Sequence, residues 1–397
     1  MVYLRAAQSA DPKISETNWL CGGVIIHERY ILTSAACIED AKRFYVVSGT
    51  HKWVAAQDKS NECINNGAKK AIWKCVPKAY YFDGEDFDNI RWMVGDIAVV
   101  KVEDNFNFER RVRGCDFIPK KVDFNNRSAD FEKAGGVGSV AGWGSREFFS
   151  DGTLIGQVQS LRASENSPAL METDVVLISK ANCKKRWEPR YHFVIDEHMI
   201  CSKDETDAEA MSVVCSEREV NCKELLYTDD EKSDEEDQPE RRMMVNPNSL
   251  YVHTADHETF RRTKVLSGGF CENDHGGPLI IGQGKTSMVV GVMSACLTKD
   301  VERKCYGPFL YTSVYRYRNL ISCAIDKDIG PTCRKLLRSS KTPVTETTFD
   351  WNNHIDGSKG DHPAIHQVRS FDHFRLTGYS PTKKTTEKPV EAPKTDS

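Results

Sequence analysis

The chain has 397 residues, 39% of them hydrophobic and 28% charged, and its formal net charge is −4 at pH 7. A near-neutral chain has no overall electrostatic field that would attract nucleic acid or an anionic membrane surface. No stretch of 18 consecutive apolar residues predicts a transmembrane helix. We therefore expect no nucleic-acid partner and no membrane partner, and we expect a monomer.

The 14 cysteines are spread over residues 21–333 and form no paired CxxC motifs of the zinc-finger kind. Cytosolic proteins rarely keep so many cysteines, so an oxidising compartment is favoured. The sequon Asn126-Arg127-Ser128 predicts glycosylation at Asn126. The opening residues MVYLR are not a signal peptide. We therefore expect a secreted, extracellular protein whose export signal is absent from this sequence.

Short apolar runs separated by turns predict β-strands along most of the chain. Residues 24–26 and 30–32 flank a polar break and predict a hairpin. Further strands are predicted at residues 97–102, 175–178, 289–293 and 309–314. A helix is expected at about residues 315–327. Many short strands with glycine turns are typical of an all-β barrel or sandwich.

Two polar stretches interrupt this pattern. Residues 203–266 contain an acidic run at 229–237, and residues 339–397 are rich in Thr, Lys, Pro and Ser. Both lack the apolar density that would offset the entropy of ordering them. We predict an acidic insertion at about 203–266, either a solvated spacer or a docking site for a basic partner. We predict a folded domain over 1–338 and a disordered tail over 339–397.

Four motifs, in a fixed order, carry a family resemblance. They are CGGVII at 21–26, LTSAAC at 32–37, GDIAVV at 95–100 and CENDHGGPL at 271–279. They resemble the CGGSLI, LTAAHC, DIAL and CxGDSGGPL motifs of the chymotrypsin/trypsin-like (S1) serine proteases. The resemblance covers about residues 1–325. It implies an all-β double barrel of six strands each with a C-terminal helix, the family's first strand being only partly present.

The resemblance also assigns the catalytic positions. Asp96 stands where the family has the aspartate that orients the catalytic histidine. Ala36 stands at the position of that histidine, and His275 at the position of the serine nucleophile. Asn273 replaces the glycine that contributes to the oxyanion hole. Because a methyl group takes no proton and an imidazole has no hydroxyl to acylate, we expect no orthodox serine proteolysis.

Other residues offer weak routes to a rebuilt site. His27 lies one strand away from the catalytic edge, Ser34 lies along a core strand in the family, and Ser294 matches a serine behind the triad. A zinc site of His275 with Asp96 and Asp274 as nearby oxygen ligands is the other alternative, but no motif of ligand spacing supports it. We expect His275 to fill a vacated pocket, and we expect no metal and no other cofactor.

The substrate pocket is altered in the same comparison. Gly269 lies at its base, where an aspartate would select Lys or Arg. Ser294, Ala295 and Cys296 replace the family's Ser-Trp-Gly segment. Phe309 stands where the family has glycine, so we expect its ring to fill the pocket.

Asp274 matches the aspartate that pairs with the freed amino group of the family's mature Ile-Val-Gly-Gly terminus. That tetrapeptide is missing from this sequence. We therefore expect Asp274 either to have another partner or to be a costly buried unpaired charge.

Disulfide pairs follow from two arguments. The resemblance implies Cys21–Cys37, Cys183–Cys201 and Cys271–Cys305. Proximity in sequence alone suggests Cys63–Cys75, Cys215–Cys222 and Cys323–Cys333. Cys115 and Cys296 have no obvious partner by these arguments, and a bridge from Cys115 to a missing N-terminal segment stays open.

We therefore expect a secreted, non-catalytic serine protease homologue that acts by binding. Its partners would be other secreted proteins, such as proteases, zymogens or inhibitors, and it would act as a cofactor or decoy in an extracellular proteolytic cascade. The alternatives are an active serine endopeptidase and a structural or storage component of a secretion.

Overall fold

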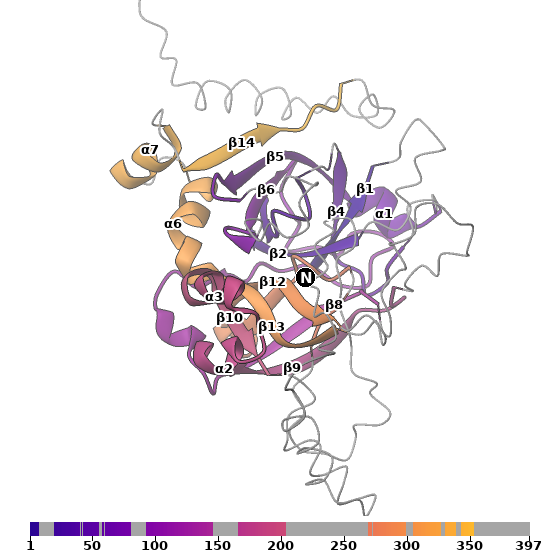
Figure 1. Cartoon of the computed structure of the whole chain (residues 1–397). Helices are drawn as coiled ribbons and strands as arrows, with labels where there is room; N and C mark the ends of the chain where they lie inside the picture. The colour runs from indigo at the N-terminus through magenta and orange to yellow at the C-terminus, as the bar shows by residue number, and fades with distance from the viewer. Residues whose placement is uncertain are drawn as a thin grey trace, which may run out of the picture.

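The computed structural model describes most of the motifs but not the whole chain. The described residues are 1–7, 20–39, 41, 43–54, 58, 60–80, 93–145, 166–203, 269–271, 273–298, 305–326, 330–338 and 343–352. Most of the predicted acidic insertion and most of the predicted tail lie outside them. The described residues form two β-barrels, one above the other in Figure 1. None of the helices in the described ranges has the length and hydropathy needed to cross a membrane.

Six antiparallel strands close the first barrel. They are β1 (Val2–Ala6), β2 (Leu20–His27), β3 (Tyr30–Thr33), β4 (Phe44–Val47), β5 (Lys69–Pro77) and β6 (Ala98–Val102). The strand order is β5-β4-β1-β2-β3-β6, and the β5–β6 pairing closes the ring. The predicted hairpin is β2–β3, in which Val24 lies opposite Leu32. Both side chains are buried, in a hydrophobic cluster that also contains Val289 and Val292 of the second barrel.

The second barrel repeats this plan. Its strands are β8 (Val137–Gly142), β9 (Met171–Ile178), β10 (Met199–Ser202), β11 (Pro278–Ile281), β12 (Met288–Thr298) and β13 (Cys305–Ser313). The order is β11-β8-β9-β10-β13-β12, closed by β11–β12, and the short β7 (Asp123–Phe124) adds to β12 in parallel. The prediction of two six-stranded barrels is confirmed.

Short helices lie between the strands and a longer one follows them. The short helices are α1 (Glu62–Gly67), α2 (Lys180–Lys184) and α3 (His192–His198). Helix α6 (Val314–Ile325) starts one residue before its predicted range, capped by Ser313, whose hydroxyl accepts from Arg316 N at 3.1 Å. Helix α7 (Pro331–Arg338) follows, and the Cys323–Cys333 disulfide joins it to α6.

The predicted domain boundary at residue 338 is too early. Strand β14 (Val344–Thr348) pairs antiparallel with β5 on the outside of the first barrel, at the top of Figure 1. Beyond it Phe349 and Trp351 are buried, at 5% and 2% exposure. Trp351 Nε1 donates to Ala71 O at 2.8 Å. Residues 343–352 are therefore part of the folded domain. Three apolar side chains in this polar segment, those of Val344, Phe349 and Trp351, are buried.

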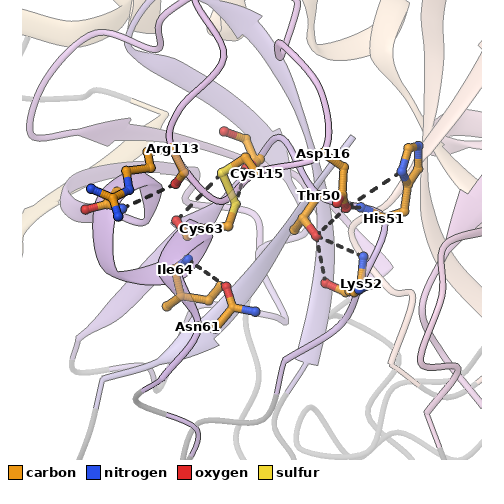
Figure 2. Close-up of a disulfide and its surroundings, with 11 residues drawn as sticks. Thr50, His51, Lys52, Asn61, Cys63, Ile64, Arg113, Cys115 and Asp116 are labelled. Carbon is orange, nitrogen blue, oxygen red and sulfur yellow. Dashed lines mark hydrogen bonds and ion pairs between the residues drawn. A yellow bond between two sulfur atoms is a disulfide. The ribbon is translucent and has the colours of Figure 1, made fainter.

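Five disulfides join described cysteines. They are Cys21–Cys37, Cys63–Cys115, Cys183–Cys201, Cys271–Cys305 and Cys323–Cys333. Three of them are the pairs that the resemblance implies, and Cys323–Cys333 is the pair suggested by proximity. The suggested Cys63–Cys75 pair is wrong, because Cys63 in α1 bonds Cys115 in the loop after β6 (Figure 2). Cys215 and Cys222 lie outside the described residues.

Replacing Trp351 with alanine is expected to lower the free energy of unfolding by about 3–5 kcal/mol, because it removes a buried ring from the core. Guanidinium denaturation under non-reducing conditions measures this change. Val137→Ala is the control, since Val137 is 60% exposed and its loss should cost under about 0.5 kcal/mol. A Trp351→Ala effect as small as the control's would show that residues 343–352 do not belong to the folded domain.

Candidate functional site

Asp96 is the centre of a buried polar cluster between the two barrels. It precedes β6, and its side chain is fully buried. Oδ1 accepts hydrogen bonds from the Ser34 hydroxyl and from Ala36 N, the latter at 2.9 Å. These two donors come from the segment after β3, so Asp96 ties together two loops of the first barrel.

The second barrel supplies the partners of Oδ2. His275 Nε2 lies 2.6 Å from Oδ2, and the Ser294 hydroxyl donates to the same oxygen at 2.7 Å. His275 lies just before β11 and Ser294 lies within β12. The imidazole thus reaches the aspartate from the position of the nucleophile. It pairs with the carboxylate across the two barrels.

The charge on Asp96 is stabilised by these contacts. Burial by itself would raise the pKa of Asp96, but the neighbouring His275 and the hydrogen bonds from His275, Ala36 and Ser294 outweigh it. The pKa of Asp96 is therefore held below its usual value. His275 is itself 2% exposed, and its backbone oxygen accepts from Gly22 N at 2.8 Å.

This arrangement does not activate a nucleophile. The triad mechanism needs a serine hydroxyl that donates to an imidazole, which then takes its proton. Here the hydroxyls of Ser34 and Ser294 both donate to Asp96, and a carboxylate of lowered pKa is a weak base. His27, the third candidate for a rebuilt site, lies at the end of β2 against the Tyr30 ring and contributes nothing to this cluster.

Asn273 takes the backbone conformation of the glycine that it replaces. Its φ of 74° lies in the left-handed region, which asparagine tolerates better than most residues. Its side-chain nitrogen donates to Asn166 Oδ1 at 2.7 Å, and Asn273 is only 7% exposed. Asn166 could not be identified from the motifs, because it lies 107 residues away in sequence.

Asp274 lies apart from the Asp96 cluster and has only part of its hydrogen bonding satisfied. Oδ1 accepts from Gly144 N at 2.7 Å, whereas Oδ2 has no hydrogen-bond partner among the described residues. A Cβ at Gly142 would come within 1.7 Å of Oδ1, so only glycine leaves room for this side chain. Burial raises the pKa of Asp274 well above its usual value, against the smaller opposing effect of the Gly144 and Trp143 amides.

An aromatic cluster fills the space beside Gly269. Phe309 in β13 lies so close that a Cβ on Gly269 would come within 1.9 Å of its Cζ. Phe270 packs beside it, with its ring centroid 5.2 Å from that of Phe309 in a tilted contact and 5.1 Å from that of Tyr311 in an edge-to-face contact. All three rings are at most 2% exposed. The structure therefore places a packed core where the sequence comparison places the base of the substrate pocket.

The neighbouring strand β12 carries the other predicted pocket residues. Ala295 and Cys296 are buried at 6% and 7% exposure. The Cys296 sulfur lies 2.6 Å from the sulfur of Cys305, which is bonded to Cys271. Burial raises the pKa of the Cys296 thiol. In the described part of the chain, no group of three His, Cys, Asp or Glu side chains could hold a metal ion.

His275→Ala is expected to lower the free energy of unfolding at pH 7 by about 3–5 kcal/mol, because it leaves a buried carboxylate without the imidazole that is paired with it. Since the pKa of Asp96 is lowered in the folded protein, this stabilisation is present above the ordinary carboxyl pKa. It is lost as the pH falls through the folded-state pKa. Denaturation curves from pH 7 to pH 3 should therefore show the two proteins converging. A pH-independent difference, or one below about 1 kcal/mol, would contradict the ion pair.

Asp274→Asn is expected to stabilise the protein at pH 7. The raised pKa of Asp274 means that its contribution is favourable below the ordinary carboxyl pKa and is lost as the pH rises towards the folded-state pKa. An amide of the same shape stays neutral throughout. Thermal melts should show a higher midpoint for the variant at pH 7 and equal midpoints below pH 4. Asp174→Asn is the matched control, since Asp174 is exposed on β9. An equal rise of the thermal midpoint in both variants would contradict the raised pKa of the buried Asp274.

Comparisons with known proteins support the same family. The sequence model of the Trypsin family matches residues 7–212, just over half of the chain. A chymotrypsin of Phaedon cochleariae is 30% identical over 129 residues, which is 32% of this chain and 40% of that protein. Venom serine protease 34 of Apis mellifera is 30% identical over 135 residues, 34% of this chain and 30% of its own length. The chain thus spans less than half the length of these two relatives.

A solved structure with a similar arrangement is the scabies mite inactivated protease paralogue S-D1. It has a TM-score of 0.45 and 15% sequence identity, and it covers 83% of this chain and 93% of its own. The family match, the two closed barrels and the four ordered motifs agree. The chain belongs to the trypsin family of serine proteases.

Proposed function

We propose that this chain is a non-catalytic member of the family that acts by binding other proteins. The observation that carries the proposal is the contact between His275 and Asp96, 2.6 Å apart and buried. The residue at the nucleophile's position is bound to the aspartate itself, and Ala36 at the base's position has no side chain that accepts a proton. Acyl transfer by the family's mechanism needs both groups.

The size of the expected defect is large. Removing the serine or the histidine of a Ser-His-Asp triad in another serine protease costs about 10⁶-fold in kcat, and removing both costs about the same. The alternative function, authentic endopeptidase activity, would need a different nucleophile. The two serine hydroxyls nearest to Asp96 both donate to its carboxylate, which argues against that alternative.

The filled pocket supports the same proposal. Phe309 packs against Gly269 and Phe270, the position that the family resemblance assigns to a substrate side chain. Opening this space would expose a core that is packed at the density of a protein interior. A protein of this kind keeps the outer surfaces of a protease without cutting, so we place its partners among proteases, zymogens and inhibitors of extracellular cascades.

Secretion belongs to the same proposal. Five disulfides close described parts of the two barrels, and such bonds persist in oxidising compartments. Asn126 is exposed directly after β7, where the sequon is accessible to a glycan. Both observations fit an extracellular protein.

Fluorophosphonate labelling and peptide hydrolysis test the proposal. The oxidised chain is expected to give no label and no turnover above a heat-denatured sample, because no activated serine is present. The variant Ala36→His with Asn273→Gly and His275→Ser restores the three side chains of the family, and it is the positive comparison. We expect label on this variant and peptide turnover only after Phe309→Gly is added.

Label on the unmodified chain, mapped by mass spectrometry to one of its own residues, would contradict the proposal. Ser34→Ala and Ser294→Ala identify the nucleophile in that case, because each removes one hydroxyl of the Asp96 cluster. The absence of label on these two variants, against label on the unmodified chain, would establish the alternative endopeptidase.

A further inference from the structure

Three arginines lie within four positions of a loop in the first barrel. The loop follows β6 and reads NFERRVRG over residues 107–114. Arg110, Arg111 and Arg113 are all exposed, whereas Val112 between them is half-buried. The loop contributes no residue to the Asp96 cluster or to the aromatic cluster, so the proposed function does not account for it.

The C-terminal end of the loop is fixed by a covalent bond and a turn. Cys115 bonds Cys63 of α1, and Cys115 N donates to Val112 O at 3.1 Å. Gly114 in this turn has a φ of 83°, a conformation that favours glycine. Figure 2 shows Arg113 beside this disulfide, at the edge of α1.

Helix α1 holds the same end through side chains. Asn66 Nδ2 donates to the backbone oxygen of Arg113 at 3.3 Å. Val112 packs on the end of the helix, since a Cβ on Gly67 would lie 3.2 Å from Val112 Cγ1. Val112 therefore faces the helix, and the arginines on both sides of it face the solvent.

The N-terminal end of the loop is held by an asparagine. Asn107 Oδ1 accepts from Glu109 N at 3.0 Å and from Arg110 N at 2.8 Å. With both ends fixed, the backbone that carries the guanidinium groups is already ordered before a ligand binds. Such preorganisation lowers the entropic cost of binding.

Nearby acidic groups do not neutralise the three charges. Among the described residues, Arg110 and Arg111 form no ion pair. Arg113 lies 3.2 Å from Glu62, but both side chains are more than half exposed, and such a pair is weak and exchanges easily. Glu109 is exposed in the loop itself. Asp116 is bound on the other side of the disulfide, where it accepts from Thr50 Oγ1 at 2.9 Å.

We propose that residues 107–114 form a binding site for a sulfated polysaccharide. A guanidinium group donates two parallel hydrogen bonds to one oxyanion, which suits sulfate groups repeated along a sugar chain. Short arginine-rich segments of this kind are typical of heparin-like ligands. The three arginines form a local basic patch, although the net charge of the whole chain is −4.

The surroundings of the loop disfavour other polyanions. Single-stranded nucleic acid needs exposed aromatic rings for base stacking, but Phe106 is 3% exposed and Phe108 is half-buried. A protein partner would use an apolar anchor at the centre of its interface. The exposed large apolar side chains among the described residues are Phe131, Val137 and Phe193, and none of them belongs to the loop.

Affinity for heparin, measured by calorimetry on the full oxidised chain at 0.15 M NaCl, tests the site. The variant Arg110→Ala with Arg111→Ala and Arg113→Ala is expected to bind roughly 10- to 100-fold more weakly and to elute from heparin resin at lower salt. The matched control removes Arg127, Lys133 and Arg190, also by alanine. These three are also exposed and in weak surface ion pairs, as Arg113 is, but none of them belongs to the loop. The control should bind like the unmodified chain.

Three further arms identify the ligand chemistry. Lysine at the three arginine positions should give intermediate affinity, because charge is kept and the paired hydrogen bonds are lost. Desulfated heparin should not bind detectably. Duplex DNA and polyglutamate should bind at least tenfold more weakly than heparin. Equal loss of affinity in the alanine variant and its control, equal binding of desulfated heparin, or tighter binding of DNA or polyglutamate would overturn the proposal. None of these results depends on whether the chain hydrolyses peptides.

Discussion

The hydrogen bonds to the buried carboxylate of Asp96 hold the two barrels together at their centre. A carboxylate that is fully buried must be paired and hydrogen-bonded, or its desolvation would unfold a marginally stable domain. Ser34 and Ala36 contribute donors from the first barrel, and His275 and Ser294 from the second. In a chain without a histidine at position 36, the imidazole of His275 meets this requirement from the opposite barrel.

The contacts that join the two barrels also take up the polar groups around Asp96. The hydroxyls of Ser34 and Ser294 and the imidazole of His275 all contact the carboxylate of Asp96. Neither hydroxyl therefore donates a hydrogen bond to the imidazole. The aromatic cluster around Phe309 extends this buried interior, because its rings fill the space beside Gly269. The described residues around Asp96 and Phe309 therefore form a closed interior that helps to hold the double barrel together.

Local motifs predict a large part of this structure. The strands, the pair of barrels and the residues at the catalytic positions follow from short segments whose order is diagnostic. The sequence also predicts that His275 fills a vacated pocket. It does not show that the ring binds Asp96, because that contact joins residues 179 positions apart and depends on the space left by Ala36. The Cys63–Cys115 bond spans 52 residues, which proximity in sequence could not identify. Strand β14 was missed because its few apolar residues are diluted by a polar composition.

Asp96 and Asp274 show how pairing decides the response of a buried carboxyl to pH. Asp96 has four donors from side chains and backbone, and its pKa is lowered in spite of burial. Asp274 has one oxygen without a partner among the described residues, and burial raises its pKa. The folded state therefore favours one combination, with Asp96 ionised and Asp274 neutral. In the family the aspartate matching Asp274 is paired with an amino group. Here burial favours the neutral form, since a neutral carboxyl is the cheaper form of a buried group with one oxygen that lacks a partner among the described residues.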